Sequence, residues 1–94
     1  MEYVFISSKE DLESIKEYEK FFQNKSNLEL VNSYNREAKS GIVGVRQQIR
    51  YLLALRNEFL KRFNESPIYV SDQYAVGLTG IIELVNNQIR IKQQ

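Results

Sequence analysis

The sequence predicts a small α+β domain in which two helices cover a single sheet of about five short strands, in the order β-α-β-α-β-ββ. Three observations support this prediction. Apolar residues recur every three or four positions over residues 9–23 and 42–63, as they do on one face of a helix. Short β-branched and aromatic runs lie before and after these segments. The C-terminal residues alternate between polar and apolar around Asn86-Asn87, which is typical of a hairpin.

The N-terminal half is expected to form a strand, a helix and a second strand. Residues 3–6 are β-branched or aromatic and end at serines, as a short buried strand does. Ser8 precedes a pair of acidic residues, which predicts a helix N-cap followed by a helix over residues 9–23. Residues 28–34 then favour a second strand, and the polar residues 35–41 favour a surface loop.

The strongest helical pattern covers residues 42–63, where the apolar side chains gather on one side of the predicted helix. These side chains are Val45, Ile49, Leu52, Leu53, Phe59, Leu60 and Phe63. Pro67 follows the segment and ends it, because proline disfavours helical backbone at the residue before it and has no N–H to donate. Residues 68–70 are extended again.

The last quarter of the chain allows two structures. Residues 81–85 and 88–92 flank two asparagines that tolerate the positive φ of a two-residue turn, which predicts a hairpin. The alternative is a helix over residues 72–90, which would make the protein an antiparallel helical bundle. Gly77 and Gly80 disfavour that helix.

Composition limits the chemistry available to the chain. Residues 1–94 are expected to form one domain, because a chain of this length supports one modest core. Cysteine and histidine are absent, so we expect a non-enzymatic protein without a metal or other cofactor. The N-terminus has no basic region, and no apolar run approaches the roughly 18 residues of a membrane span. These features predict a soluble cytoplasmic protein with no membrane partner.

Basic residues are concentrated in the middle of the chain. Residues 36–63 contain seven basic and two acidic side chains, a net charge of +5, whereas the whole chain carries +1. Arg46, Arg50 and Lys61 fall on one stripe of the predicted long helix, which predicts a surface for an acidic protein or for phosphates. The alternative is a solvated face that pairs with the acidic first helix.

Arg56 falls near the centre of the apolar side of the same helix. A buried guanidinium needs a carboxylate partner, and Glu37, Asp72 and Glu83 are the candidates for a buried ion pair. Alternatively, the Arg56 stem covers the core while its charged end reaches water.

Two short motifs resemble parts of known families. Gly41 and Gly44 precede a helix with the spacing of the glycine loop of KH domains, which implies a weak anion site; a tight turn is the alternative. The run from Tyr3 to Ser8, with the acids after it, is similar to the opening strand and first loop of TIR-like α/β domains. That resemblance covers about ten residues, and no activity is transferred from it.

A second candidate surface lies at the end of the strand predicted over residues 68–70, where Tyr69, Asp72 and Tyr74 come close together in the sequence. We therefore expect an interaction module, a small accessory, regulatory or immunity-type protein that binds a protein partner through this loop and the basic helix face. A nucleic-acid-binding regulator that uses the basic face is the alternative, and a small-ligand or phosphate-binding domain is the second alternative. Residues 88–92 also provide a sheet edge through which the protein could form homo-oligomers, unless Arg90 and Lys92 guard that edge.

Overall fold

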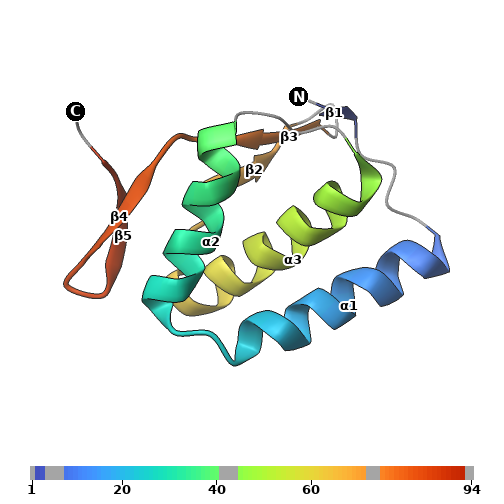
Figure 1. Cartoon of the computed structure of the whole chain (residues 1–94), viewed down its shortest axis with the longest axis horizontal. Coiled ribbons are helices and arrows are strands. Elements are labelled where there is room, and N and C mark those ends of the chain that lie inside the picture. Colours follow the sequence, from blue (N-terminus) through green and yellow to red (C-terminus); the bar gives the residue numbers. More distant parts are fainter. Residues whose placement is uncertain (1, 4–7, 41–44, 72–74, 93–94) are drawn as a thin grey trace.

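The computed structural model describes residues 2–3, 8–40, 45–71 and 75–92 (Figure 1). The class is α+β, as the sequence predicts. The helices are α1 (Lys9–Gln23), α2 (Asn27–Ser40) and α3 (Arg46–Phe63), and the strands are β1 (Glu2–Tyr3), β2 (Ile68–Val70), β3 (Ala75–Leu78), β4 (Ile82–Val85) and β5 (Gln88–Ile91). None of the helices in the described residues is both long and apolar enough to cross a membrane.

Helix α1 begins where the sequence predicts. The Ser8 hydroxyl accepts a hydrogen bond from the Asp11 N–H at 3.1 Å, so Ser8 is the N-cap. The predicted strand over residues 3–6 is observed in part, since β1 contains Tyr3; residues 4–6 lie outside the described residues.

The predicted strand over residues 28–34 and the loop after it are wrong, because this part of the chain is α2. A reciprocal capping box starts the helix: the Glu29 N–H donates to the Ser26 hydroxyl at 3.1 Å, and the Ser26 N–H donates to the Glu29 carboxylate at 2.8 Å. Leu30, Val31 and Tyr34 then face the core at helical spacing. The described residues therefore form three helices instead of the two that the sequence predicts.

Helix α3 confirms most of the predicted long helix. It begins at Arg46, after Val45 in extended conformation, and residues 42–44 lie outside the described residues. At its end, Asn64 adopts a left-handed conformation with φ 60°, and its N–H donates to the Leu60 carbonyl.

The strands form two sheets rather than the single sheet expected from the sequence. One sheet is antiparallel with the order β1-β3-β2, and the other is the pair β4-β5. The turn between β3 and β4 contains Gly80 with φ 124°, a conformation that favours glycine. The buried Tyr34 of α2 holds this turn, since its hydroxyl donates to the Gly80 carbonyl at 2.7 Å and accepts from the Gly80 N–H at 3.1 Å.

The C-terminal hairpin is confirmed, whereas the helix predicted as its alternative over residues 72–90 is not observed in the described residues. Asn86 and Asn87 have φ of 52° and 61°, and Val85 pairs with Gln88, as in a two-residue hairpin with two left-handed turn residues. Isolated hairpins have little stability, so this one depends on its packing against the rest of the protein.

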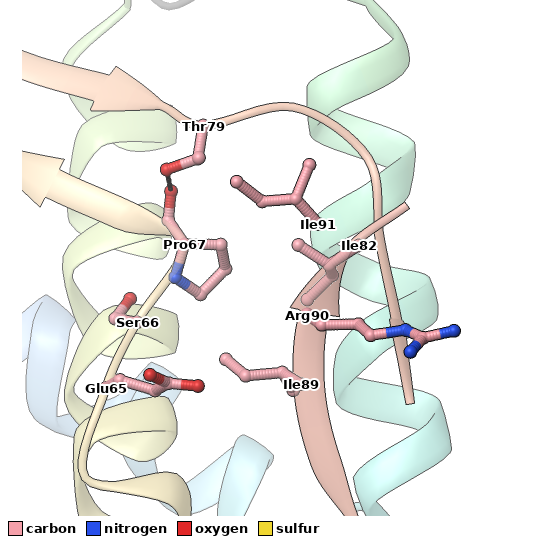
Figure 2. Close-up of a pocket in the computed structure, with 8 residues that line it drawn as sticks. All are labelled: Glu65, Ser66, Pro67, Thr79, Ile82, Ile89, Arg90 and Ile91. Carbon is pink, nitrogen blue, oxygen red and sulfur yellow. Dashed lines mark hydrogen bonds between the residues drawn. The ribbon is translucent and has the colours of Figure 1, made fainter. Parts of the chain in front are cut away.

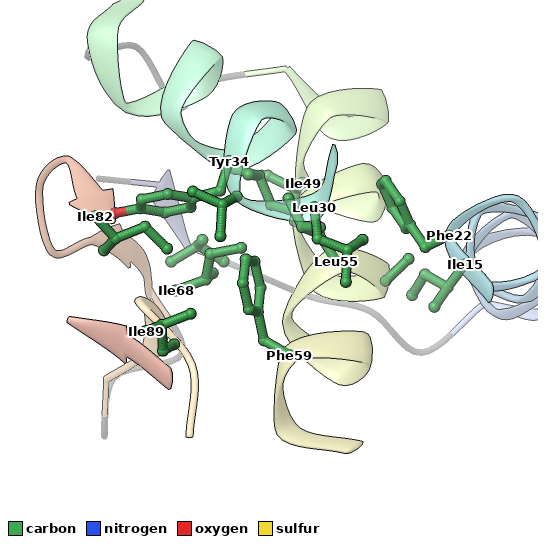
Figure 3. Packing of buried hydrophobic residues seen from close by; sticks show 14 residues of the cluster. Ile15, Phe22, Leu30, Tyr34, Ile49, Leu55, Phe59, Ile68, Ile82 and Ile89 are labelled. Carbon is green, nitrogen blue, oxygen red and sulfur yellow. The ribbon is translucent and has the colours of Figure 1, made fainter. Parts of the chain in front are cut away.

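The core runs continuously from α1 to the hairpin. In Figure 1, α3 lies beside α1, and the hairpin lies on the far side of α2 from α1. Figure 3 shows Ile15 and Phe22 of α1 at one end of the core and Ile82 and Ile89 of the hairpin at the other. The buried apolar cluster consists of Ile15, Phe22, Leu30, Val31, Tyr34, Ile49, Leu52, Ala54, Leu55, Phe59, Ile68, Val76, Ile82 and Ile89.

Candidate functional site

Two residues of the predicted basic stripe point toward α1 and bind Asp11. The Arg46 Nε lies 2.8 Å from Asp11 Oδ1, the Arg50 Nε lies 2.7 Å from the same oxygen, and the Arg46 Nη2 bonds Asp11 Oδ2. The Ser8 hydroxyl adds a hydrogen bond to Oδ2 at 2.8 Å. For Arg46 and Arg50, the structure therefore has the alternative arrangement, in which the stripe pairs with the acidic first helix.

This ion pair is buried on its acidic side. The Asp11 side chain is 0% exposed, whereas Arg50 is 18% and Arg46 54% exposed. The hydrogen bond from Arg46, with those from Ser8 and Arg50, holds the pKa of Asp11 well below its usual range, although desolvation acts in the opposite direction. The cluster joins the start of α1 to the start of α3, which is a structural role.

Lys61 lies apart from this cluster. It is separated from Arg50 by roughly 16 Å along α3, at 1.5 Å per residue. Lys61 is exposed and borders a surface cavity of about 250 Å³ between α1 and α3, whose lining includes Lys16, Glu19 and Glu58. The basic stripe is therefore divided into two regions, and the second contains charges of both signs.

Arg62 joins three helices, and the sequence analysis missed this role. Its Nε lies 2.7 Å from Glu58, which is 6% exposed, and its other nitrogens donate to the Asn27 side chain at 3.1 Å and to the carbonyls of Phe22 and Gln23. These carbonyls end α1, so the guanidinium caps that helix. The i,i+4 spacing of an acid and an arginine was the only signal in the sequence.

Arg56 is half-buried, and no ion pair joins it to another described residue. Two of its candidate partners have other contacts, since Glu83 pairs with Arg90 at 2.9 Å and Glu37 accepts a hydrogen bond from Gln48. Asp72, the third candidate, lies outside the described residues.

Tyr69 is the one member of the predicted tyrosine loop that the structure describes; Asp72 and Tyr74 lie outside the described residues, as do Gly41 and Gly44 of the weak anion motif. Tyr69 is 43% exposed on β2, opposite Gly77 of β3. Its ring covers the glycine, because a Cβ at position 77 would lie 2.3 Å from Tyr69 Cζ. The ring thus protects the main chain of the sheet.

The geometry of the hairpin leaves β5 with an open edge. The Lys92 N–H donates to the Ile81 carbonyl at 2.9 Å, and Val85 pairs with Gln88 across the turn. Inward and outward main-chain groups alternate along an antiparallel ladder, so the N–H and C=O groups of Ile89 and Ile91 point away from β4. No described residue forms a hydrogen bond with these groups.

The opposite edge of the hairpin is covered at one of its two outward-facing residues, Ile82. The outward-facing residues of β4 are Ile82 and Leu84. The Ile82 N–H donates to the Asn35 Oδ1 and its carbonyl accepts from the Asn35 Nδ2, both at 2.9 Å. The amide of α2 thus takes the place of a neighbouring strand. A strand added at this edge would have to displace Asn35 from Ile82, whereas the outward groups of Ile89 and Ile91 have no partner among the described residues.

A cavity of about 290 Å³ borders β5 (Figure 2). It lies between the hairpin and the segment that connects α3 to β2. Its apolar lining comes from Pro67, Ile82, Ile89 and Ile91, and its polar lining from Glu65, Ser66, Thr79 and Arg90. Ile89 is 8% exposed and Ile91 54% exposed, so the apolar surface continues from the core to the outside of the molecule.

Three consecutive residues of β5 line this cavity, although successive side chains of a strand point to opposite faces. The cavity therefore extends along the main chain of the strand as well as along its apolar face. Within the described ranges, no group of three or more Asp or Glu side chains is arranged to hold a metal ion.

No protein-family model matches the sequence, and no curated protein or solved structure is significantly similar to it. Function must therefore be inferred from the geometry of the chain.

Proposed function

We propose that this protein is a non-enzymatic interaction module that binds an extended segment of a partner protein as an additional strand beside β5. The observation that supports the proposal is the open edge of β5, where the N–H and C=O groups of Ile89 and Ile91 point outward beside an apolar cavity. Strand addition of this kind derives its affinity from main-chain hydrogen bonds and its specificity from side-chain pockets. Both requirements are available at β5.

The contact of Asn35 with the β4 edge adds to this case. An unpaired strand edge risks aggregation, and proteins commonly cover such edges. Here Asn35 covers the β4 edge at Ile82 with two hydrogen bonds, whereas the outward N–H and C=O groups of Ile89 and Ile91 on β5 have no partner among the described residues. We infer that β5 is the binding edge.

The basic face of α3 is a weaker candidate. Nucleic-acid affinity depends on cations that are free to neutralise phosphates. Arg46 and Arg50 both bind Asp11, and the third cation of the stripe lies at the other end of the helix. We therefore place the partner at the hairpin.

A proline substitution tests strand addition directly. The Ile91 N–H points away from β4, so Ile91→Pro removes an outward donor while the hairpin keeps its own hydrogen bonds. Ile91→Ala is the matched control, because it also lacks the isoleucine side chain but retains the N–H. Peptides selected from a displayed random library against the wild-type protein serve as ligands.

We expect the selected peptides to bind Ile91→Pro about tenfold more weakly than Ile91→Ala, the effect of about 1.4 kcal/mol from one lost hydrogen bond and a steric block. In NMR titrations, the amide signals of Ile89 and Ile91 should shift, and their hydrogen exchange should slow. Equal affinity for the two variants, with these amides unchanged, would show that the peptides bind elsewhere and would refute the proposal.

A further inference from the structure

We infer that the strand accepted by β5 belongs to a different protein and alternates apolar residues with acidic ones. This inference rests on the strand addition proposed above and adds the chemistry of the partner. It follows from the different side chains on the two faces of β5.

The inner face of the added strand meets apolar surface. Side chains on an added strand alternate between faces, and those on the inner face lie beside Ile89 and Ile91. Figure 2 shows Pro67 across the cavity from Ile82, Ile89 and Ile91. Ile89 is 8% exposed, so apolar residues are favoured at the inner positions, where they can cover Ile91 and the apolar side of the cavity.

The outer face of β5 is basic. Alternation places Gln88, Arg90 and Lys92 on this face, and all three are exposed. The Arg90 side chain is 64% exposed and pairs with Glu83 on its β4 side at 2.9 Å. A guanidinium has five N–H donors, so Arg90 retains donors for a carboxylate on its other side. Opposite charges on neighbouring strands are stabilising, which favours acidic residues at the partner's outer positions.

The same charges disfavour a second copy of this chain. In the antiparallel pairing with the greatest overlap, Ile89 faces Ile91 of the second copy, but Arg90 faces Arg90. If Ile91 lies on the twofold axis instead, Arg90 faces Lys92. Like charges directly opposite each other are destabilising. If Ile89 lies on the axis, Asn87 would have to pair as a strand residue. Its left-handed conformation, with φ 61°, is incompatible with a regular strand.

The test uses a charge swap that keeps the hairpin. Three synthetic peptides share alternating valines and carry Glu, Gln or Lys at the positions between them. Each is titrated against the wild-type protein and against the double variant Glu83→Arg with Arg90→Glu. This variant retains a cross-strand ion pair but presents a carboxylate to the added strand.

We expect the wild-type protein to bind the Glu peptide about two- to fivefold more tightly than the Lys peptide, as one cross-strand charge pair predicts. Added salt should reduce this preference, and the double variant should reverse it. If NMR shows that the double variant loses its hairpin, Arg90→Gln replaces it, and the preference for the Glu peptide should decrease.

The outcomes separate the two levels of the proposal. Peptides whose binding depends on the Ile91 N–H could rank in the same order of affinity for the wild type and the double variant. That result would contradict an acidic partner strand but would still support strand addition. Peptides of all three charges that fail to bind through this edge would overturn strand addition itself. A dimer in sedimentation experiments that Ile91→Pro abolishes and Ile91→Ala preserves would identify a second copy as the occupant, contrary to the inference.

Discussion

The side-chain amide of Asn35 forms the two main-chain hydrogen bonds that a neighbouring strand would otherwise give to Ile82. Its Nδ2 donates to the Ile82 carbonyl and its Oδ1 accepts from the Ile82 N–H, both at 2.9 Å. A single helical residue thus anchors the hairpin to α2. The same contact makes the two edges of the hairpin unequal, which is the basis of the proposed function.

Replacing Asn35 by alanine should destabilise the protein by about 1–3 kcal/mol, because the N–H and C=O of the nearly buried Ile82 lose their partners. Urea unfolding at neutral pH measures this change. Asn35→Asp is the matched variant, since it keeps an acceptor for the Ile82 N–H and loses the donor to the carbonyl. The free energy of unfolding of Asn35→Asp should lie between those of the wild type and Asn35→Ala. An Asn35→Ala variant as stable as the wild type would contradict the role of Asn35.

The Tyr34→Phe variant removes the α2 hydroxyl that binds the turn between the two sheets. The hydroxyl bonds both main-chain groups of Gly80, and its burial raises the pKa of Tyr34. We expect a loss of about 1–3 kcal/mol in the free energy of unfolding, because the main chain of Gly80 is left without these partners. Tyr69→Phe is the control on an exposed tyrosine and should change stability by less than about 0.5 kcal/mol. Equal effects of the two substitutions would exclude a special contribution from Tyr34.

The Asp11 cluster should make stability depend on pH in the acidic range. The folded protein holds the pKa of Asp11 below its ordinary value of 3.8. The stabilisation is therefore present above the unfolded pKa and is lost as the pH falls through the folded pKa. We expect Asp11→Asn to lower the melting temperature by several degrees at pH 7, and the difference from the wild type to shrink between about pH 5 and 2.

Glu13→Gln is the control for this titration, because Glu13 lies on the same helix and makes only a solvent-exposed pair with Lys9 at 4.0 Å. It should melt close to the wild type throughout the range. Hydrogen bonds from Ser26 also lower the pKa of Glu29, so the wild type and Asp11→Asn both lose stability in acid for this second reason. The difference in melting temperature between them isolates the contribution of Asp11. A difference in melting temperature between Asp11→Asn and the wild type that stays constant down to pH 2 would show that the ionisation of Asp11 does not stabilise the fold.

Local signals in the sequence account for the elements that were predicted correctly. The cap at Ser8 and the turn at Asn86-Asn87 depend on residues a few positions apart, and the structure has both. Residues 28–34 contain a local conflict, since leucine, valine and tyrosine suit a strand while Ser26 and Glu29 form a helix capping box. Burial of Leu30 and Tyr34 on one face of α2 decides in favour of the helix.

The candidate site could be predicted only in part. Alternation over residues 88–92 indicated an exposed edge, and its basic residues follow from the same pattern. The cavity could not be predicted in this way, because Pro67 and Thr79 reach the hairpin from other elements through the tertiary fold. The same limit applies to Arg46 and Arg50: their position on one stripe was visible, but their contact with Asp11 depends on how α1 packs against α3.

The pairing of β1 with β3 fixes the order in which the protein can complete its structure during translation. Glu2 pairs with Val76 and Tyr3 with Ala75, so β1 needs a partner that the ribosome makes more than 70 residues later. The helices form through local contacts and can pack while synthesis continues. We therefore expect nascent chains of increasing length to gain helical structure first and to close the three-stranded sheet only after residues 75–78 have left the exit tunnel.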